Sequence, residues 1–225
     1  MFCVIIALAA ILVITSGLLY LQVVKTDFEQ TRWFTLWEFF NVDREFNIPT
    51  WLASSMWLVL GIVAAVVGVV APRLKWLWFI FAAVGIYASA DEAAMLHEQL
   101  YRLGSILTPY LSFDPFYYRW VIGGIVVAIG VIAVLLPLVW RLPLPIMLML
   151  VAAGTIFLSG AVVMETLSGR MIEFHGKTTW HTMLLIHIEE SLEFLGVALA
   201  IWAVFEMLIV RRTDEGLAIG FRGYR

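Results

Sequence analysis

The sequence predicts an all-α fold, a six-transmembrane-helix bundle with an interfacial helix between the first two spans. Two observations predict this class. Hydrophobic residues make up 63% of the 225-residue chain and charged residues only 14%, whereas soluble domains carry about 25% charged residues. Apolar runs long enough to cross a hydrocarbon core of about 30 Å also recur along the chain.

The expected spans are separated by short polar or proline-containing breaks, such as Pro72-Arg73-Leu74-Lys75. Tryptophans lie near most of the expected ends, as in the aromatic belts of membrane proteins. The first run has no preceding Lys or Arg and exceeds the length of a signal-peptide core, so we expect a retained helix. We predict a single integral membrane domain over residues 1–225, with helices at about 1–24, 51–71, 76–100, 119–140, 146–169 and 180–210 and a polar cytoplasmic tail at 211–225.

The segment between the first two spans carries an amphipathic pattern. Its aromatic and aliphatic residues follow helical spacing, at Trp33, Leu36, Trp37 and Phe40. This spacing favours a short helix lying in the membrane interface. The alternative is a loop that is tethered by its aromatic residues.

The net charge and the distribution of basic residues limit the partners and the orientation of the chain. A net charge of −3 argues against nucleic acid as a partner. Basic residues are denser in the short loops on the side of the two termini, which favours cytoplasmic termini. The expected partner is the lipid bilayer, with other membrane subunits or a homo-oligomer as further candidates. Cys3 is the only cysteine, so an intrachain disulfide is excluded.

Carboxylates inside the expected spans are the informative feature. A charged carboxylate at mid-span costs about 2.5–3.5 kcal/mol, so packing alone gives no reason to keep several. Counting 1.5 Å per residue from the helix ends places most of them about 7–15 Å deep in one half of the bilayer. Glu206 lies near the opposite end, where we expect an ion pair with Arg211 or Arg212.

Helical spacing predicts that these residues converge on a metal ion. Asp91 and Glu98 are seven residues apart and share a face of the expected third helix, and His187 and Glu190 are adjacent on the last. Oxygen-rich ligands with one or two imidazoles suit Fe, Mn or Zn. The predicted ligands are Asp91, Glu98, Glu165, His187 and Glu190, with Glu92, His97, Glu189 and Glu193 as supporting or alternate ligands.

Two further roles are possible for the acidic residues. They can form a protonated or arginine-paired structural network, or a pathway for protons or cations. The match to a di-iron bundle is partial, because such bundles use Glu-x-x-His pairs and this chain has the reversed His187-x-x-Glu190. His181 is either a ligand or an interfacial histidine, and His175 is expected to be solvated.

Several short motifs together resemble a group of uncharacterised bacterial multi-pass membrane proteins. These motifs are Asn47-Ile48-Pro49-Thr50-Trp51, Asp91-Glu92 with His97-Glu98, and Glu189-Glu190 with Glu193. The resemblance covers most of the chain and implies a bacterial inner-membrane protein, but it implies no function. From the residues we predict a metal-dependent oxidoreductase or hydrolase acting on a lipid-soluble substrate. A proton or cation transporter or sensor, and an accessory subunit of a larger membrane complex, are the alternatives.

Overall fold

The computed structural model describes residues 2–26, 32–110, 117–214 and 216–225, and it is mostly helical. The predicted start of the first helix at Met1, and parts of the connections 25–50 and 101–118, lie outside these residues. Five helices are long and apolar enough to cross a membrane. They are α1 (Phe2–Lys25), α3 (Ile48–Val70), α4 (Lys75–Ala94), α6 (Trp120–Val139) and the continuous helix Leu144–His175.

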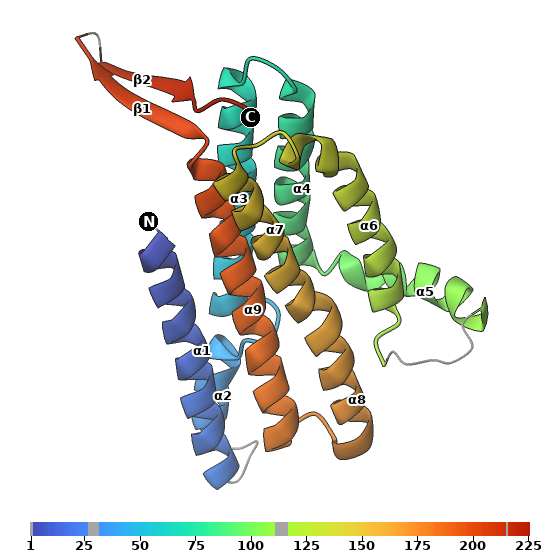
Figure 1. Ribbon diagram of the computed structural model, residues 1–225. Coiled ribbons are helices and arrows are strands. Elements are labelled where there is room, and N and C mark those ends of the chain that lie inside the picture. The colour runs from blue at the N-terminus through green and yellow to red at the C-terminus, as the bar shows by residue number, and fades with distance from the viewer. Residues whose placement is uncertain (1, 27–31, 111–116, 215) are drawn as a thin grey trace.

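Helix α9 (Trp180–Phe205) lies in the middle of the bundle, where it packs against α1, α3 and the Leu144–His175 helix (Figure 1). Its length is similar to that of the five apolar helices. Its three carboxylates, Glu189, Glu190 and Glu193, separate it in composition from the five apolar helices. Ionisable residues of membrane helices usually face the interior of the bundle, and they often have a functional role.

Local capping moves the start of the second predicted span. Asn47 caps α3, because its side chain accepts a hydrogen bond from the Thr50 N–H at 3.2 Å, and Pro49 lies in the first turn. The helix therefore begins at Ile48 rather than Trp51. A helix α2 (Arg32–Phe40) is present in the segment where the amphipathic spacing predicted one, and its Trp37 is buried.

The third predicted helix is shorter than expected. Helix α4 ends at Ala94, and Met95 adopts a left-handed conformation with φ of 51°. A separate 3₁₀ turn, η1 (His97–Leu100), follows, and then α5 (Tyr101–Leu107) and η2 (Thr108–Tyr110). The expectation of one helix through Leu100 was wrong, because a left-handed residue cannot continue a right-handed helix.

The fifth predicted helix is longer than expected and contains an irregular turn. It consists of α7 (Leu144–Leu158), a π-helical segment η3 (Ser159–Met164) and α8 (Glu165–His175). It therefore continues past the expected end at Gly169 to His175. Single π turns inside α-helices occur frequently at functional sites.

The C-terminal segment is a β-hairpin rather than the end of a helix and a polar tail. Helix α9 ends at Phe205, and β1 (Leu208–Thr213) pairs antiparallel with β2 (Gly216–Phe221). The run Leu208-Ile209-Val210 includes two β-branched residues, which favour a β-strand. The final residues return to the bundle, where the Arg225 Nε donates to the Trp140 carbonyl at 3.0 Å.

One helix stands apart from the packed centre. Helices α3 and α4 pack closely, with Gly61 and Gly85 at their crossing, and α7 packs on α9. Helix α6 makes its main contacts with α4, α5, η1 and η3 instead (Figure 1). This separation between α6 and the α3, α7 and α9 helices leaves room for a cavity.

Candidate functional site

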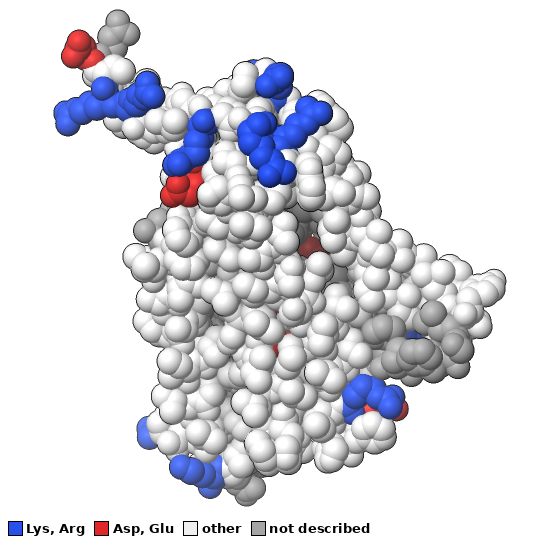
Figure 2. Space-filling view, in the orientation of Figure 1, with Lys and Arg blue, Asp and Glu red and all other residues white. Residues whose placement is uncertain are grey.

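A large cavity of about 1160 Å³ lies between α6 and the other long helices. Figure 2 shows a hollow in the surface between α7 and α6, with atoms of Asp or Glu residues visible inside it. Cavities of about 300–1000 Å³ are typical of small-molecule sites, so this volume is sufficient for a ligand.

Acidic side chains from four parts of the chain line this cavity. They come from the α2–α3 connection, the end of α4 with η1, the start of α8, and α9. The acidic lining residues are Asp43, Glu45, Asp91, Glu92, Glu98, Glu165, Glu189, Glu190 and Glu193. The basic or imidazole groups among the described lining residues are Arg44, His97 and Lys177. Nine acidic groups therefore face three groups that can carry positive charge, and the remaining charge must be balanced by protons, cations or a ligand.

The turn after α4 folds His97 back onto Asp91. The His97 backbone N–H donates to Asp91 Oδ1, and the His97 Nδ1 lies 3.1 Å from Asp91 Oδ2. The left-handed Met95 makes this reversal possible. The imidazole also lies against Trp120 of α6, with ring centroids 4.6 Å apart. Asp91, His97 and Trp120 thus connect α4 to the helix that forms the outer wall of the cavity.

The charge state of His97 is set by its acidic neighbours. Burial alone lowers the pKa of this imidazole, but the hydrogen bond and charge of Asp91, with the charges of Glu92 and Glu45, raise its pKa above the ordinary value. These negative groups favour the imidazolium form. His97 therefore supplies positive charge to the acidic end of the cavity.

The π-helical segment positions Glu165 against α9. Gly160 in this segment lies so close to α9 that an added Cβ would be 2.8 Å from Glu193 Cγ and 2.9 Å from the Glu189 carbonyl oxygen. About two turns after Gly160, the Ser168 hydroxyl donates to Glu189 Oε2 at 2.9 Å. Glu165 also lies within hydrogen-bonding reach of Glu189. The close approach brings Glu165 of α8 beside Glu189 of α9.

The connection between α2 and α3 adds two acidic residues that the sequence analysis did not select. Asp43 forms an ion pair with Lys177 at 2.8 Å, and burial raises the pKa of Asp43 against the opposing effect of Lys177. Burial also raises the pKa of Glu45, which the nearby His97 partly offsets. In sequence the run Asp43-Arg44-Glu45 is typical of a polar turn. Its three charged residues shortly before a helix with proline in its first turn were the available sign that it belongs to the site.

A tyrosine also lines the acidic end of the cavity. Burial raises the pKa of Tyr118, and the negative charges of Glu165 and Asp43 raise it further. The phenol therefore stays protonated and can donate a hydrogen bond inside the cavity. Tyr118 precedes α6, and an aromatic residue in a connection rich in aromatics carried no specific signal in the sequence.

His187 faces a different neighbour from Glu190 and Glu193. Its Nδ1 lies 2.7 Å from the Met183 carbonyl oxygen, and its buried Nε2 points toward Gly17 of α1 without a hydrogen-bond partner among the described residues. Within the part of the chain that the structure describes, His187 is not one of the cavity-lining residues. His175 and His181 are exposed and lie beside each other at the end of α8 and the start of α9.

The structure brings most of the predicted ligands to one cavity but does not group them as ligands of an ion. Asp91, Glu98, Glu165 and Glu190 all line it, and so do Glu92, His97, Glu189 and Glu193. Over residues 2–26, 32–110, 117–214 and 216–225, three or more His, Cys, Asp or Glu side chains placed to hold a metal ion are not found.

The rest of the cavity is apolar and reaches along the length of α6. Its lining includes Trp120 at one end of this helix and Val139 at the other. Val127, Ile132 and Leu136 line the cavity and are about half exposed. The cavity is therefore apolar along most of α6.

These features define a mostly helical protein with five helices long and apolar enough to cross a membrane. Its described residues enclose an amphiphilic cavity that is acidic at one end and apolar along its length. The chain matches over residues 4–208 a family described as a domain of unknown function, DUF8692, and it belongs to that family. No curated protein and no solved structure matches the chain.

Proposed function

We propose that this protein binds a lipid-soluble amphiphile, with a cationic or hydrogen-bond-donating head group among the carboxylates and an apolar chain along α6. The single observation that carries this proposal is the division of the cavity into an acidic end and an apolar remainder. Nine acidic residues line the first, and aliphatic residues of α6 and α7 line the second. An anionic head group would be repelled by this surplus of carboxylates.

The proposal includes the position of the protein in the bilayer. Helix α9 would be the sixth span, with both termini in the cytoplasm of a bacterium and the acidic end of the cavity toward the outer face of the inner membrane. Helix α2 would lie in that outer interface. The gathering of Lys and Arg at the hairpin end of the molecule supports this orientation (Figure 2).

Photochemical labelling tests the proposal directly. The purified protein in nanodiscs is exposed to three chain-matched diazirine probes, a long-chain amine, alcohol and acid. We expect the amine to label cavity-lining residues at least about tenfold more than the acid does, because one favourable charge contact is worth about 1.4 kcal/mol or more. Equal labelling by all three probes, or labelling confined to residues outside the cavity, would contradict the proposal.

Two variants separate cavity binding from general contact with lipid. Gly154 of α7 lines the cavity and has open space around it, so Gly154→Trp fills the apolar part. Gly130 of α6 also has open space but is not among the described lining residues, so Gly130→Trp is the matched control. We expect labelling to be lost in the first variant and retained in the second.

The second candidate is a metal-dependent enzyme, an oxidoreductase or hydrolase that acts on such an amphiphile. The observation that favours it is the excess of carboxylates over basic groups in the cavity. A bound Fe, Mn or Zn ion would balance that charge and activate water or oxygen beside the substrate. Elemental analysis of the wild-type protein beside Glu190→Ala tests it. Metal that is retained by the wild type and lost in the variant supports this candidate, and metal-free wild type after supplementation rejects it.

A further inference from the structure

The C-terminal hairpin has one face that begins on the bundle and continues beyond it. Cross-strand partners share a face, so Leu208 and Phe221 lie on the same side as Val210 and Ile219. Leu208 and Phe221 pack against the central hydrophobic core. The outer part of this face is exposed, at 57% for Val210, 50% for Ile219 and 73% for Leu217. The exposed apolar residues therefore face the same side as the residues that touch the bundle.

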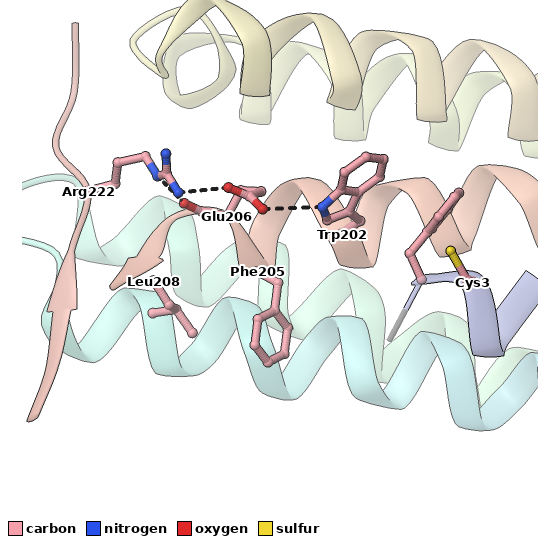
Figure 3. Close-up of a pocket in the computed structure, with 7 residues that line it drawn as sticks. Cys3, Trp202, Phe205, Glu206, Leu208 and Arg222 are labelled. Atoms are coloured by element: carbon pink, nitrogen blue, oxygen red, sulfur yellow. Dashed lines mark hydrogen bonds and ion pairs between the residues drawn. The ribbon is translucent and has the colours of Figure 1, made fainter. Parts of the chain in front are cut away.

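The base of the hairpin is held firmly to the end of α9. Figure 3 shows Glu206 between Arg222, at 2.7 Å, and the Trp202 indole N–H, at 3.3 Å. Arg222 was not the expected partner of Glu206, since the sequence had suggested Arg211 or Arg212. Because Arg222 takes that position, Arg211 and Arg212 are exposed on β1. The hairpin projects from the bundle at the end of α9 (Figure 1).

Basic side chains surround the hairpin at this end of the molecule. Figure 2 shows Lys and Arg gathered on the hairpin and on the neighbouring helix ends. They come from the connections around α4 and α7 and from the C-terminal segment, as Arg73, Lys75, Arg141, Arg211, Arg212, Arg222 and Arg225. Clusters of four to eight basic residues directly beside membrane spans attract anionic lipids, with about 1 kcal/mol for each residue near the surface.

We propose that the hairpin lies on the anionic leaflet around the bundle, with Val210, Leu217 and Ile219 in the lipid interface. Arg212, the cross-strand partner of Leu217, shares this face and would lie at the phosphates. The apolar face is directed toward the side on which the bilayer surrounds the helices. Arginine can bury its aliphatic stem in the interface while its guanidinium reaches a phosphate. This inference is independent of the cavity, which has its acidic end at the other end of α9.

Spin labels on adjacent residues of β2 test this placement in the full-length protein. In a Cys3→Ser background, a nitroxide is attached at Leu217→Cys or at Ala218→Cys, which lies on the opposite face of the hairpin. The proteins are placed in nanodiscs of phosphatidylcholine with phosphatidylglycerol. We expect the label at 217 to be more accessible to oxygen than to a water-soluble nickel complex, and the label at 218 to show the reverse.

Charge reversal provides the second measurement. Arg211→Glu with Arg212→Glu, or nanodiscs of phosphatidylcholine alone, should shift the label at 217 toward accessibility to nickel. Ile219→Cys repeats the test on the same face, in case the label at 217 disturbs the hairpin. If 217 and 218 are equally accessible to nickel in anionic nanodiscs, the hairpin faces water and the proposal is wrong. Shielding of 217 from both reagents would also overturn it, since this indicates contact with protein.

Discussion

The imidazole of His97 lies 3.1 Å from the carboxylate of Asp91, six residues earlier in the chain and on the other side of a helix terminus. The same carboxylate accepts the His97 backbone N–H. One side chain therefore caps the reversed turn and holds the imidazole against Trp120 of the outer helix. This relationship joins α4 to α6 at the acidic end of the cavity.

The stability of the protein is expected to depend on pH through His97. Its pKa is raised in the folded state above the ordinary value of 6.5. The stabilisation by the imidazolium is therefore fully present below about pH 6.5 and is lost as the pH rises through the higher folded-state pKa. Thermal unfolding in detergent across this window should show a melting temperature that falls as pH rises. His97→Gln should remove this part of the slope, and an unchanged slope in that variant would reject the assignment.

The contact between α7 and α9 should be intolerant of even one added methyl group. A Cβ at Gly196 would lie 2.7 Å from Phe157 Cβ and 2.9 Å from the Ala153 carbonyl oxygen. Gly196→Ala should therefore lower stability by about 1–3 kcal/mol, since the two helices must separate. Gly130→Ala is the control, because nothing surrounds that position, and it should be neutral or stabilising by up to about 1 kcal/mol. Equal effects of the two substitutions in chemical unfolding would contradict the packing described.

The ion pair of Asp43 and Lys177 should hold together the two connections at the acidic end of the cavity. Lys177 is 56% exposed, whereas Asp43 is only 18% exposed. We expect a coupling energy of about 0.5–1 kcal/mol from a double-mutant cycle of Asp43→Asn and Lys177→Met, since one partner is well solvated. Additive single effects would show that the pair contributes nothing. Lys25→Met, at the exposed end of α1, is the control for loss of a surface lysine.

Hydropathy was sufficient to predict a mostly helical chain with several helices that can cross a membrane, because apolar length decides which segments can do so. Five helices meet this criterion, and α9, the predicted sixth span, is not among them. The ends of the helices were harder to place. The early end of α4 depends on Met95 in a left-handed conformation, which no propensity scale anticipates for methionine. The hairpin depends on strands whose Arg211-Arg212 pair resembled a charged flank of a membrane helix.

Sequence reasoning could predict which acidic residues share the site, but it could not predict where the His187 side chain points. Glu165, Glu189 and Glu193 share a cavity as their depth in the bilayer suggested. His187 lies two three-residue steps before Glu193, and each such step rotates about 60° around a helix. The two side chains therefore face different neighbours, and His187 points toward α1. The sequence analysis paired His187 with Glu190, one step away, and of these two only Glu190 is among the cavity-lining residues.

The docking of the C-terminus should depend on the hydroxyl group of Tyr224. This hydroxyl donates to the Arg73 carbonyl at 2.6 Å and accepts from the Trp78 indole N–H at 3.1 Å, and Trp78 is fully buried. Tyr224→Phe keeps the ring but leaves a buried indole N–H without its partner, which costs about 1–3 kcal/mol. Hydrogen exchange of residues 208–225 should become faster in this variant, while exchange in α7 stays unchanged. Tyr87→Phe is the control, because Tyr87 is 55% exposed on α4. If the Tyr224→Phe hairpin exchanges as slowly as the wild type, the anchor lies instead in the hydrogen bonds of Arg222 and Arg225 to the bundle.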